Sequence, residues 1–306
     1  MVLPRITIGI CARNCEAYIR ETIESVKKQD FPHDLMELIF VDDGSEDRTS
    51  TIVKEQTYGF DISANIFHTD WKGIGHARNI VIENARTEYV LWVDGDMVLS
   101  KDFVKQSVEF MDSHPEVAIA KGRQVLRRGG NWLATVETYA RAASRMLNYE
   151  SDGARSKSLG TGGAIQRVKV LRQVGGFDEN LRGYGEDFDL EIRVRDKGHL
   201  LCTIDTEFQD YERRSLTWNI LWNKYWLRGY YSYYFSRKNK GIIKHYRMFP
   251  PAAFVAGLLQ APKLYRLTHQ RVVFLVPIES TFKIFAWYCG FWRAQNSRPK
   301  RARKGR

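Results

Sequence analysis

The N-terminal part of the chain alternates short apolar runs with longer stretches of helical periodicity. The apolar runs are rich in β-branched residues and cover residues 5–11, 35–41, 62–68 and 88–93. The helical stretches between them cover residues 15–29, 46–56 and 75–85. Strands and helices that alternate in this way predict a mostly parallel sheet with helices on both faces. We therefore expect an α/β fold of the Rossmann-like kind.

Every predicted strand ends in polar residues. The four ends read Arg13-Asn14, Asp42-Asp43-Gly44-Ser45, Asp70 to Gly73, and Asp94-Gly95-Asp96. In open parallel sheets, ligands bind beyond the carboxyl ends of the strands, so these side chains predict a common site. A lone Asp-Gly-Asp is more often a turn than a ligand set, but its coincidence with three other polar ends favours a site. Asp94 and Asp96 then suit a hard divalent cation, Mg²⁺ or Mn²⁺.

The composition predicts a globular protein whose two ends differ in charge. The 306 residues are 43% hydrophobic, enough for one large domain with an appendage. Residues 1–210 carry 27 Lys and Arg against 34 Asp and Glu, whereas residues 211–306 carry 20 against 2. A basic, aromatic-rich end favours a polyanionic partner, either an anionic membrane surface or a nucleic acid. We expect no nucleic acid, because the chain contains no recognisable nucleic-acid-reading motif.

The cysteines and the N-terminus favour the cytoplasm. Cys11, Cys15, Cys202 and Cys289 have no metal-binding spacing, which predicts free thiols in a reducing compartment. The first residues contain no apolar segment ahead of a cleavage site, so a signal peptide is not indicated.

Two nucleotide-binding motifs are excluded, since Arg78 replaces the third glycine of GxGxxG and no GxxxxGK[ST] occurs.

Four stretches, in this order and at these distances, resemble the inverting glycosyltransferases of the family 2 type. They are TIGICARNCEAYIRETIESVKKQ, LIFVDDGSEDRT, GIGHARNIVIENARTEYVLWVDGDMVLS and GGFDENLRGYGEDFDLEIRVRDKGH. The resemblance covers about residues 5–210. It implies a GT-A fold and transfer of a sugar from a nucleotide-diphosphate sugar, with residues 1–210 as the catalytic domain.

The resemblance also implies a donor site. Asp43 is expected to read the nucleotide base with support from Asp42. Residues expected to lie near the nucleoside or the phosphates are Cys11, Arg13, Asn14, Lys72, Gly73, Arg78 and Asn79, with Arg78 charged to contact the diphosphate. Cys11 stands where the family usually has Pro or Thr. In the DxD motif, Asp94 is expected near the ribose or a metal-bound water, and Asp96 on the Mn²⁺ or Mg²⁺ that bridges the phosphates.

The catalytic base is expected in the GYGEDFDL segment. By resemblance, Asp187 is the general base and Glu186 orients the acceptor, so that displacement with a single base inverts the anomeric carbon. An acidic first turn of a helix is the plain alternative. Family members often supply a His after the last core strand as a further metal ligand. None stands here, and Asp210, Glu212 or water is expected in its place.

The segment between the DxD motif and the base is expected to shape the acceptor pocket. Thr161, Gly162 and Gly163 predict a flexible approach to the site, and residues 131–150 an amphipathic helix. The cluster Lys121, Arg123, Arg127 and Arg128 has the charge to hold an acceptor phosphate, with Arg127 and Arg128 as its main members. A charge run is more often a solvated face.

Residues 211–297 predict a helical, membrane-associating extension. A stripe of aromatic residues recurs at every fourth position: Trp218, Trp222, Trp226, Tyr230 and Tyr234. Such a stripe either faces the catalytic domain or lies in a membrane surface. Three later apolar stretches, two of which contain prolines, stay below the roughly 18 residues of a spanning helix. We expect membrane association without spanning, helped by a disordered basic tail at 298–306.

The favoured function is transfer of a sugar to a hydroxyl of a lipid-linked or membrane-proximal saccharide, with the protein bound peripherally to the inner face of the cell membrane. One alternative is a dolichyl-type polyprenyl phosphate sugar synthase, in which the lipid phosphate is the acceptor. An alternative of another class is a non-catalytic relative that binds a nucleotide or saccharide at the membrane. The nucleotide base, the sugar and the acceptor depend on pocket shape.

Overall fold

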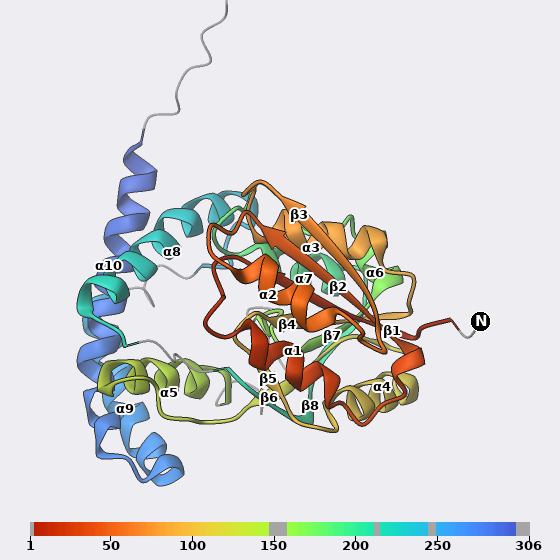
Figure 1. Ribbon diagram of the computed structural model, residues 1–306. Helices are drawn as coiled ribbons and strands as arrows, with labels where there is room; N and C mark the ends of the chain where they lie inside the picture. The colour runs from red at the N-terminus through yellow and green to blue at the C-terminus, as the bar shows by residue number, and fades with distance from the viewer. Residues whose placement is uncertain (1–2, 147–157, 211–214, 244–248, 298–306) are drawn as a thin grey trace, which may run out of the picture.

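The structure, a computed structural model, describes residues 3–146, 158–210, 215–243 and 249–297. Its centre is a single sheet with the strand order β3-β2-β1-β4-β7-β6-β8-β5 (Figure 1). The first four strands are parallel: β1 (Ile6–Ala12), β2 (Met36–Asp43), β3 (Ser63–Thr69) and β4 (Tyr89–Asp94). They confirm the strands expected from the apolar runs, and their carboxyl ends lie at one edge of the sheet.

The second half of the sheet is mixed. It consists of β5 (Val98–Leu99), β6 (Val117–Gln124), β7 (Ala164–Arg167) and β8 (Leu200–Gln209). Strand β7 runs antiparallel to both β4 and β6, and β5 runs antiparallel to β8, whereas β6 and β8 are parallel. The sheet is therefore mostly parallel, as expected. The antiparallel β7 places the loop before it, which contains Gly162, beside the end of β4.

Helices cover both faces of the sheet. The helices of the α/β body are α1 (Ile19–Lys27), α2 (Thr49–Thr57), α3 (Ile74–Asn84), α4 (Phe103–Ser113), α5 (Trp132–Met146), α6 (Val168–Gln173) and α7 (Glu186–Asp196), with a short η1 turn (His33–Leu35). Apolar side chains of α1, α2 and α4 form the core on one face. Those of α3, α6 and α7 form the core on the other. Two buried layers explain why the central strands are apolar on both sides.

Three long helices form a C-terminal bundle beside this body. They are α8 (Trp218–Lys238), α9 (Pro250–Thr268) and α10 (Val276–Asn296), with the short η3 (Arg271–Leu275) leading into α10. Figure 1 places the bundle next to the edge toward which β1 and β2 point. Helices α8 and α10 approach closely at glycines, because a Cβ on Gly229 or Gly290 would collide with the backbone of Trp287 or Trp226.

The expectation that prolines break the apolar C-terminal stretches is wrong. Pro250 and Pro277 stand in the first turns of α9 and α10, where the missing N–H has no helical acceptor. Helix α9 continues through Pro262. As a result, Arg271–Asn296 is long and apolar enough to cross a membrane by length and composition, with a mean hydropathy of 1.4 and 39% of its window buried. A core helix of a soluble protein meets the same criterion.

The aromatic stripe of α8 was expected either to face the body or to lie in a membrane surface. In the structure, part of it packs on α10 and part of it is exposed. Trp218 and Trp222 pack edge-on against Phe282 of α10, with ring centroids 4.7 and 5.6 Å apart. Tyr234, at the far end, remains 42% exposed. The face of α8 that contacts the α/β body instead contains Phe235, which stacks on Phe188 at 5.3 Å. Residues 211–214, which begin the predicted extension and include Glu212, and the 298–306 tail lie outside the described residues.

Candidate active site

Two neighbouring aspartates at the end of β2 are fixed by backbone hydrogen bonds. Asp42 accepts from the Ser45 N–H at 2.9 Å and faces the His68 ring at 3.0 Å. Asp43 accepts from the Lys72 N–H at 3.1 Å. Both side chains are nearly fully buried, at 1% and 4% exposure. The pair therefore joins the end of β2 to the segment before α3, in the place expected for the donor site.

The end of β1 forms the adjoining wall. Asn14 adopts a left-handed backbone (φ 53°), and its backbone N–H donates to Ser45 Oγ at 3.0 Å. The Arg13 guanidinium lies over the Trp71 ring at 5.3 Å and bonds to the Gly44 carbonyl at 3.2 Å. These contacts bring the ends of β1, β2 and β3 together.

The DxD motif meets the Gly-rich loop. A Cβ on Gly162 would collide with the Asp94 carboxylate, so only glycine allows the loop to approach this closely. Gly163 has a positive φ of 73°, and a Cβ there would lie 2.5 Å from the Phe208 ring. Thr161 is buried beside them. The structure therefore brings the expected acceptor loop and the expected metal motif into contact.

The half-buried Asp96 carboxyl lies near two other acids. Burial, with repulsion from Asp210 and Asp94, raises the pKa of Asp96 to about 6, partly offset by Arg141. Asp210, expected to replace the missing His, does lie near Asp96, but its carboxylate pairs with the Arg141 guanidinium at 3.1 Å. Arg141, on α5, was not expected from the sequence, where it is one more charge on an amphipathic helix.

These carboxylates fit a dication with few protein ligands. Across the described residues, no group of three or more His, Cys, Asp or Glu side chains is arranged to hold a metal. Mg²⁺ commonly takes one or two carboxylates and completes its shell with phosphate oxygens and water. Asp94 and Asp96 match that donor set, and the mutual repulsion around Asp96 is what a bound cation would relieve.

The expected catalytic pair opens α7. Gly185, with a φ of 93°, precedes the helix, and Glu186 and Asp187 occupy its first turn. The Arg78 guanidinium bonds Glu186 at 2.8 Å, and both side chains are buried. Burial and the neighbouring Asp187 raise the pKa of Glu186 to about 7 against the pull of Arg78. Asp187 is half-buried, with its Oδ1 accepting from the Phe188 N–H at 2.7 Å.

Arg78 links the catalytic pair to the DxD motif. Burial disfavours its charge, but Glu186, Asp94 and Asp187 outweigh burial and hold the pKa of Arg78 above its ordinary value. Its expected contact with a diphosphate remains a prediction, because the guanidinium is engaged with Glu186 here. Burial and nearby Asp94 and Asp43 raise the pKa of Cys11 to about 12, against the pull of Arg78, which places that thiol at the same site.

Other residues expected at the donor site make contacts within the protein. Asn79 holds the 177–179 turn, donating to the Phe177 carbonyl at 3.0 Å and to Glu179 at 2.9 Å. Gly73 has a φ of 104°, and a Cβ there would lie 2.9 Å from the Arg182 carbonyl oxygen. Lys72 is exposed at the same segment. Their contacts with a donor stay predictions.

The four basic residues expected to hold an acceptor phosphate, at positions 121–128, have different surroundings. Lys121 is only 2% exposed, and its Nζ donates to the Leu159 carbonyl at 2.6 Å. Arg123 pairs with Asp205 and with Glu207 on β8. Lys121 is thus committed to the loop and Arg123 to two acids, and a contact of the cluster with an acceptor phosphate stays a prediction. Arg127 and Arg128 remain exposed, and Arg128 bonds Gln270 of the bundle at 2.6 Å.

The sequence did not predict that Glu191 holds the start of the Gly-rich loop. Glu191, on α7, is buried and accepts from the Leu159 N–H at 3.0 Å and the Gly160 N–H at 2.8 Å. Together with Lys121, it fixes both the N–H and the C=O groups of residues 159–160. No local sequence signal marks this clamp, since its partners are more than 30 residues apart.

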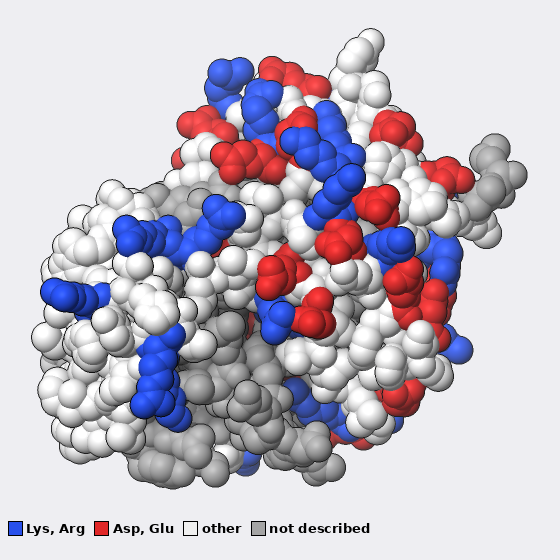
Figure 2. All heavy atoms as spheres, turned by 90° about the horizontal axis from the view of Figure 1, so that it is seen from below, with Lys and Arg blue, Asp and Glu red and all other residues white. Residues whose placement is uncertain are grey.

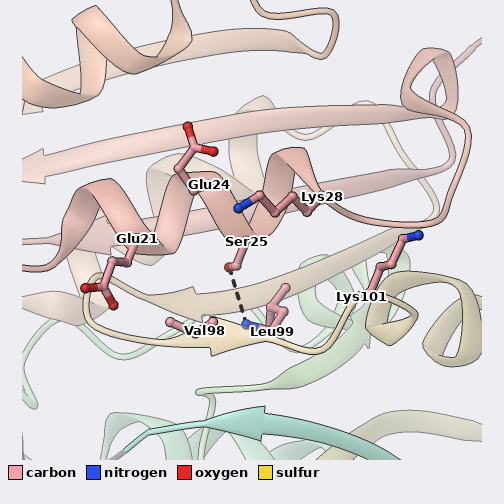
Figure 3. A pocket seen from close by; sticks show the side chains of 7 residues that line it. All are labelled: Glu21, Glu24, Ser25, Lys28, Val98, Leu99 and Lys101. Atoms are coloured by element: carbon pink, nitrogen blue, oxygen red, sulfur yellow. Dashed lines mark hydrogen bonds between the residues drawn. The ribbon is translucent and has the colours of Figure 1, made fainter.

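A surface hollow elsewhere on the body is separate from this site. It lies between α1 and the β5 segment, where the Leu99 N–H donates to Ser25 Oγ at 3.3 Å (Figure 3). Its charged lining is balanced, with Glu21, Glu24, Lys28 and Lys101 around it. None of the expected site residues lines it.

Comparisons with known proteins agree with the resemblance. The model of Glycosyl transferase family 2 matches residues 7–175. Over 117 residues, 38% of this chain, the sequence is 36% identical to the poly(ribitol-phosphate) β-N-acetylglucosaminyltransferase TarS of Staphylococcus aureus (strain Mu50 / ATCC 700699). That match spans only 20% of TarS. Over 283 residues it is 24% identical to the probable glycosyltransferase YdaM of Bacillus subtilis (strain 168), covering 86% of this chain and 66% of YdaM.

Solved structures share the fold. Residues 1–349 of S. aureus TarS, in complex with UDP, superpose with a TM-score of 0.54 at 17% identity, covering 95% of this chain and 91% of that one. The mannosyltransferase PcManGT from Pyrobaculum calidifontis, in complex with GDP-Man and Mn²⁺, gives 0.67 at 16% identity, covering 96% and 88%. Since the family model covers more than half of the chain, this protein belongs to glycosyl transferase family 2, and its structure has the GT-A fold.

Proposed function

We propose that this protein transfers a sugar from a nucleotide-diphosphate sugar to a hydroxyl group of a cell-envelope saccharide, with inversion at the anomeric carbon. The observation that carries the proposal is the meeting of three elements: Asp94 of the DxD motif, Gly162 of the Gly-rich loop, and the Arg78–Glu186 pair beside Asp187. Donor-binding and acceptor-activating groups thus border one site.

The donor lies along the ends of β1, β2 and β4. Asp43 and Asp42 read the nucleotide base, and the walls formed by Arg13 and Asn14 hold the nucleoside. Asp94 and Asp96 would hold Mn²⁺ or Mg²⁺ here. Such a cation stabilises the charge that develops on the leaving nucleoside diphosphate without a proton transfer.

Asp187 activates the acceptor. Its carboxylate takes the proton of the acceptor hydroxyl while the hydroxyl oxygen attacks the anomeric carbon, and the bond from that carbon to the phosphate oxygen breaks. Attack from the face opposite the diphosphate in a single displacement inverts the carbon. Arg78 fixes Glu186, which keeps the first turn of α7 and therefore Asp187 in place. Thr161, Gly162 and Gly163 line the acceptor side, with Arg127 and Arg128 at its rim.

The acceptor class rests on the relatives and on charge. TarS is named for poly(ribitol-phosphate), and another relative, 25% identical over 205 residues, is the poly-β-1,6-N-acetyl-D-glucosamine synthase of Staphylococcus epidermidis. A basic C-terminal region favours an acceptor carried by, or close to, an anionic membrane. Four free cysteines favour the cytoplasmic face of that membrane.

The experiment that tests this function starts with the donor. We expect one of UDP, GDP, dTDP or CDP to raise the unfolding temperature only when Mn²⁺ is present, since a ligand at a hundred times its dissociation constant stabilises by about 2.7 kcal/mol. The sugar nucleotide of that base is then incubated with a lipid-linked saccharide and, separately, with polyprenyl phosphate. A product formed only from polyprenyl phosphate, or binding without turnover, contradicts the proposal.

A further inference from the structure

Helix α10 has an inverted polarity. Two charged residues in the first half of the helix face inward: Glu279 is 1% exposed and Lys283 8%. Its outward face is apolar and half exposed, with Phe274 just before the helix at 53%, Ile278 at 55%, Phe285 at 50%, Tyr288 at 51% and Trp292 at 59%. An ordinary surface helix of a soluble protein has the opposite arrangement.

The two inward-facing charged residues of α10 form ion pairs, one of them with Glu137 of the body. Lys283 Nζ lies 2.8 Å from Glu137 Oε2 on α5 and 2.7 Å from Glu279 Oε1. The Tyr225 hydroxyl of α8 donates to Glu137 at 3.0 Å. Because this buried network fixes the rotation of α10 about its own axis, the apolar face cannot turn inward without leaving charges unpaired in the core.

Helix α9 extends the same apolar surface. It buries a narrow stripe against α10, η3 and α5, and a Cβ on Gly257 in that stripe would lie 2.5 Å from Pro277 Cα. The rest of its first turns is exposed and uncharged, including Phe254, Val255, Leu258 and Leu259 at 42%, 55%, 52% and 69%. We call the exposed residues of 254–259 together with those of 274–292 named above the α9–α10 apolar face.

The charges around this face have a single sign. Within the described residues 249–297, the exposed charged side chains are Lys263, Arg266, Arg271 and Arg293, and the one acid, Glu279, is buried. Figure 2 shows the difference: the lobe at the left has blue side chains on a white surface, whereas red and blue mix over the α/β body. An apolar face bordered by cations complements an anionic lipid surface.

We propose that the α9–α10 apolar face binds the surface of an anionic lipid bilayer, with α10 lying along the membrane and not crossing it. Crossing would require α10 to separate from α8 at Gly229 and Gly290 and would place Glu279 and Lys283 in hydrocarbon. The inference deepens the proposed function, on which its biological purpose rests, by naming the membrane-binding surface of the enzyme.

The bound membrane would lie close to the catalytic base. The face of α10 opposite the bilayer packs on α8, and α8 in turn contacts the catalytic loop, because a Cβ on Gly185 would lie 2.8 Å from Phe235. Two helix layers at 8–10 Å each put Asp187 roughly 20 Å from the lipid surface. A saccharide of a few units on a lipid carrier spans that distance.

The test measures vesicle binding without donor or acceptor. The full chain is sedimented with phosphatidylcholine vesicles with and without phosphatidylglycerol, as wild type and as the double variant Leu259→Glu/Trp292→Glu. The matched control is Tyr58→Glu/Leu200→Glu, which changes two exposed apolar residues of the body, 91% and 54% exposed. We expect tight wild-type and control binding only to vesicles with phosphatidylglycerol, and at least tenfold weaker binding of the first variant.

Three outcomes overturn the inference. One is equal vesicle binding by both double variants. Another is self-association of the wild type in place of vesicle binding, measured by light scattering and abolished by Leu259→Glu/Trp292→Glu, which assigns the face to a second copy of the chain. The third is retention of bound protein after an alkaline carbonate wash, which indicates spanning. Transfer to a soluble acceptor, expected to be equal in all variants, reports separately on the proposed function.

Discussion

The catalytic body and the C-terminal bundle place charge in opposite ways. In the body, apolar strands such as β1 and β4 fill the interior, and carboxylates gather where the strands end. Where the bundle meets α5 of the body, Lys224, Glu279 and Lys283 gather around Glu137, while aromatic side chains of the bundle face outward. The body follows the rule for a protein surrounded by water. The bundle departs from this rule on both sides, with charges buried against the body and aromatic residues exposed, and this difference points to a second environment.

The largest effect is expected in the body, at its catalytic end. Asp187→Asn removes the proposed base, and a general base contributes typically about 10²–10⁴-fold to the rate. We expect transfer to fall by that factor while the unfolding shift produced by nucleotide with Mn²⁺ is unchanged. Asp196→Asn, an exposed change at the other end of the same helix, is the control. Transfer by Asp187→Asn at the control rate would exclude Asp187 as the base.

The bundle should be sensitive at its charged interior. Glu137→Ala leaves Lys283 buried beside Glu279 alone, and breaking a buried pair costs about 3–5 kcal/mol. Chemical denaturation measures the loss in the free energy of unfolding. Glu109→Ala, an exposed glutamate of α4, should stay within about 0.5 kcal/mol of wild type. If both variants lose the same amount, the network does not hold the bundle on the body.

A buried carboxyl of the body, Glu186, should make the stability of the protein depend on pH. Burial and Asp187 raise the pKa of Glu186 to about 7, above its ordinary value of 4.5. A group that binds its proton more tightly when folded adds stability below pH 4.5, and that stability is lost as the pH rises through about 7. We expect Glu186→Gln to remove at most about 3 kcal/mol of this pH dependence. Unfolding midpoints at pH 5 and 8, with Glu109→Gln as control, measure it; an unchanged slope contradicts the shift.

The smallest effect is expected at the rim between the two regions. Arg127→Glu/Arg128→Glu should raise KM for an anionic acceptor several-fold and leave kcat unchanged, because exposed charges contribute little each. Lys54→Glu/Lys169→Glu, also exposed, makes the same change in net charge far from this rim in sequence. Equal KM values in the two double variants would mean that Arg127 and Arg128 form a solvated face.

The sequence predicted best what depends on local pattern. The strands β1 to β4 and the polar ends they share follow from runs of apolar residues, and DxD and Glu186-Asp187 lie where those ends meet. The clamp of Glu191 on residues 159–160 and the Arg141–Asp210 pair were not predictable in this way, because each joins residues far apart in the chain. The prolines misled because their effect depends on their position in a turn. The inward charges of α10 were not predictable from local pattern either, because Lys283 meets Glu137 from a distant part of the chain.

The contact between α8 and the catalytic loop limits how this enzyme can be re-engineered. Gly183 and Gly185 admit the rings of Tyr231 and Phe235, and Lys238 bonds Asp178 at 2.5 Å and Asp189 at 2.9 Å. A chimera that exchanges only the C-terminal helices for those of a relative would set foreign side chains against this loop. Residues 176–190 and 218–238 therefore form one exchangeable cassette, and acceptor preference would have to be transplanted with both halves together.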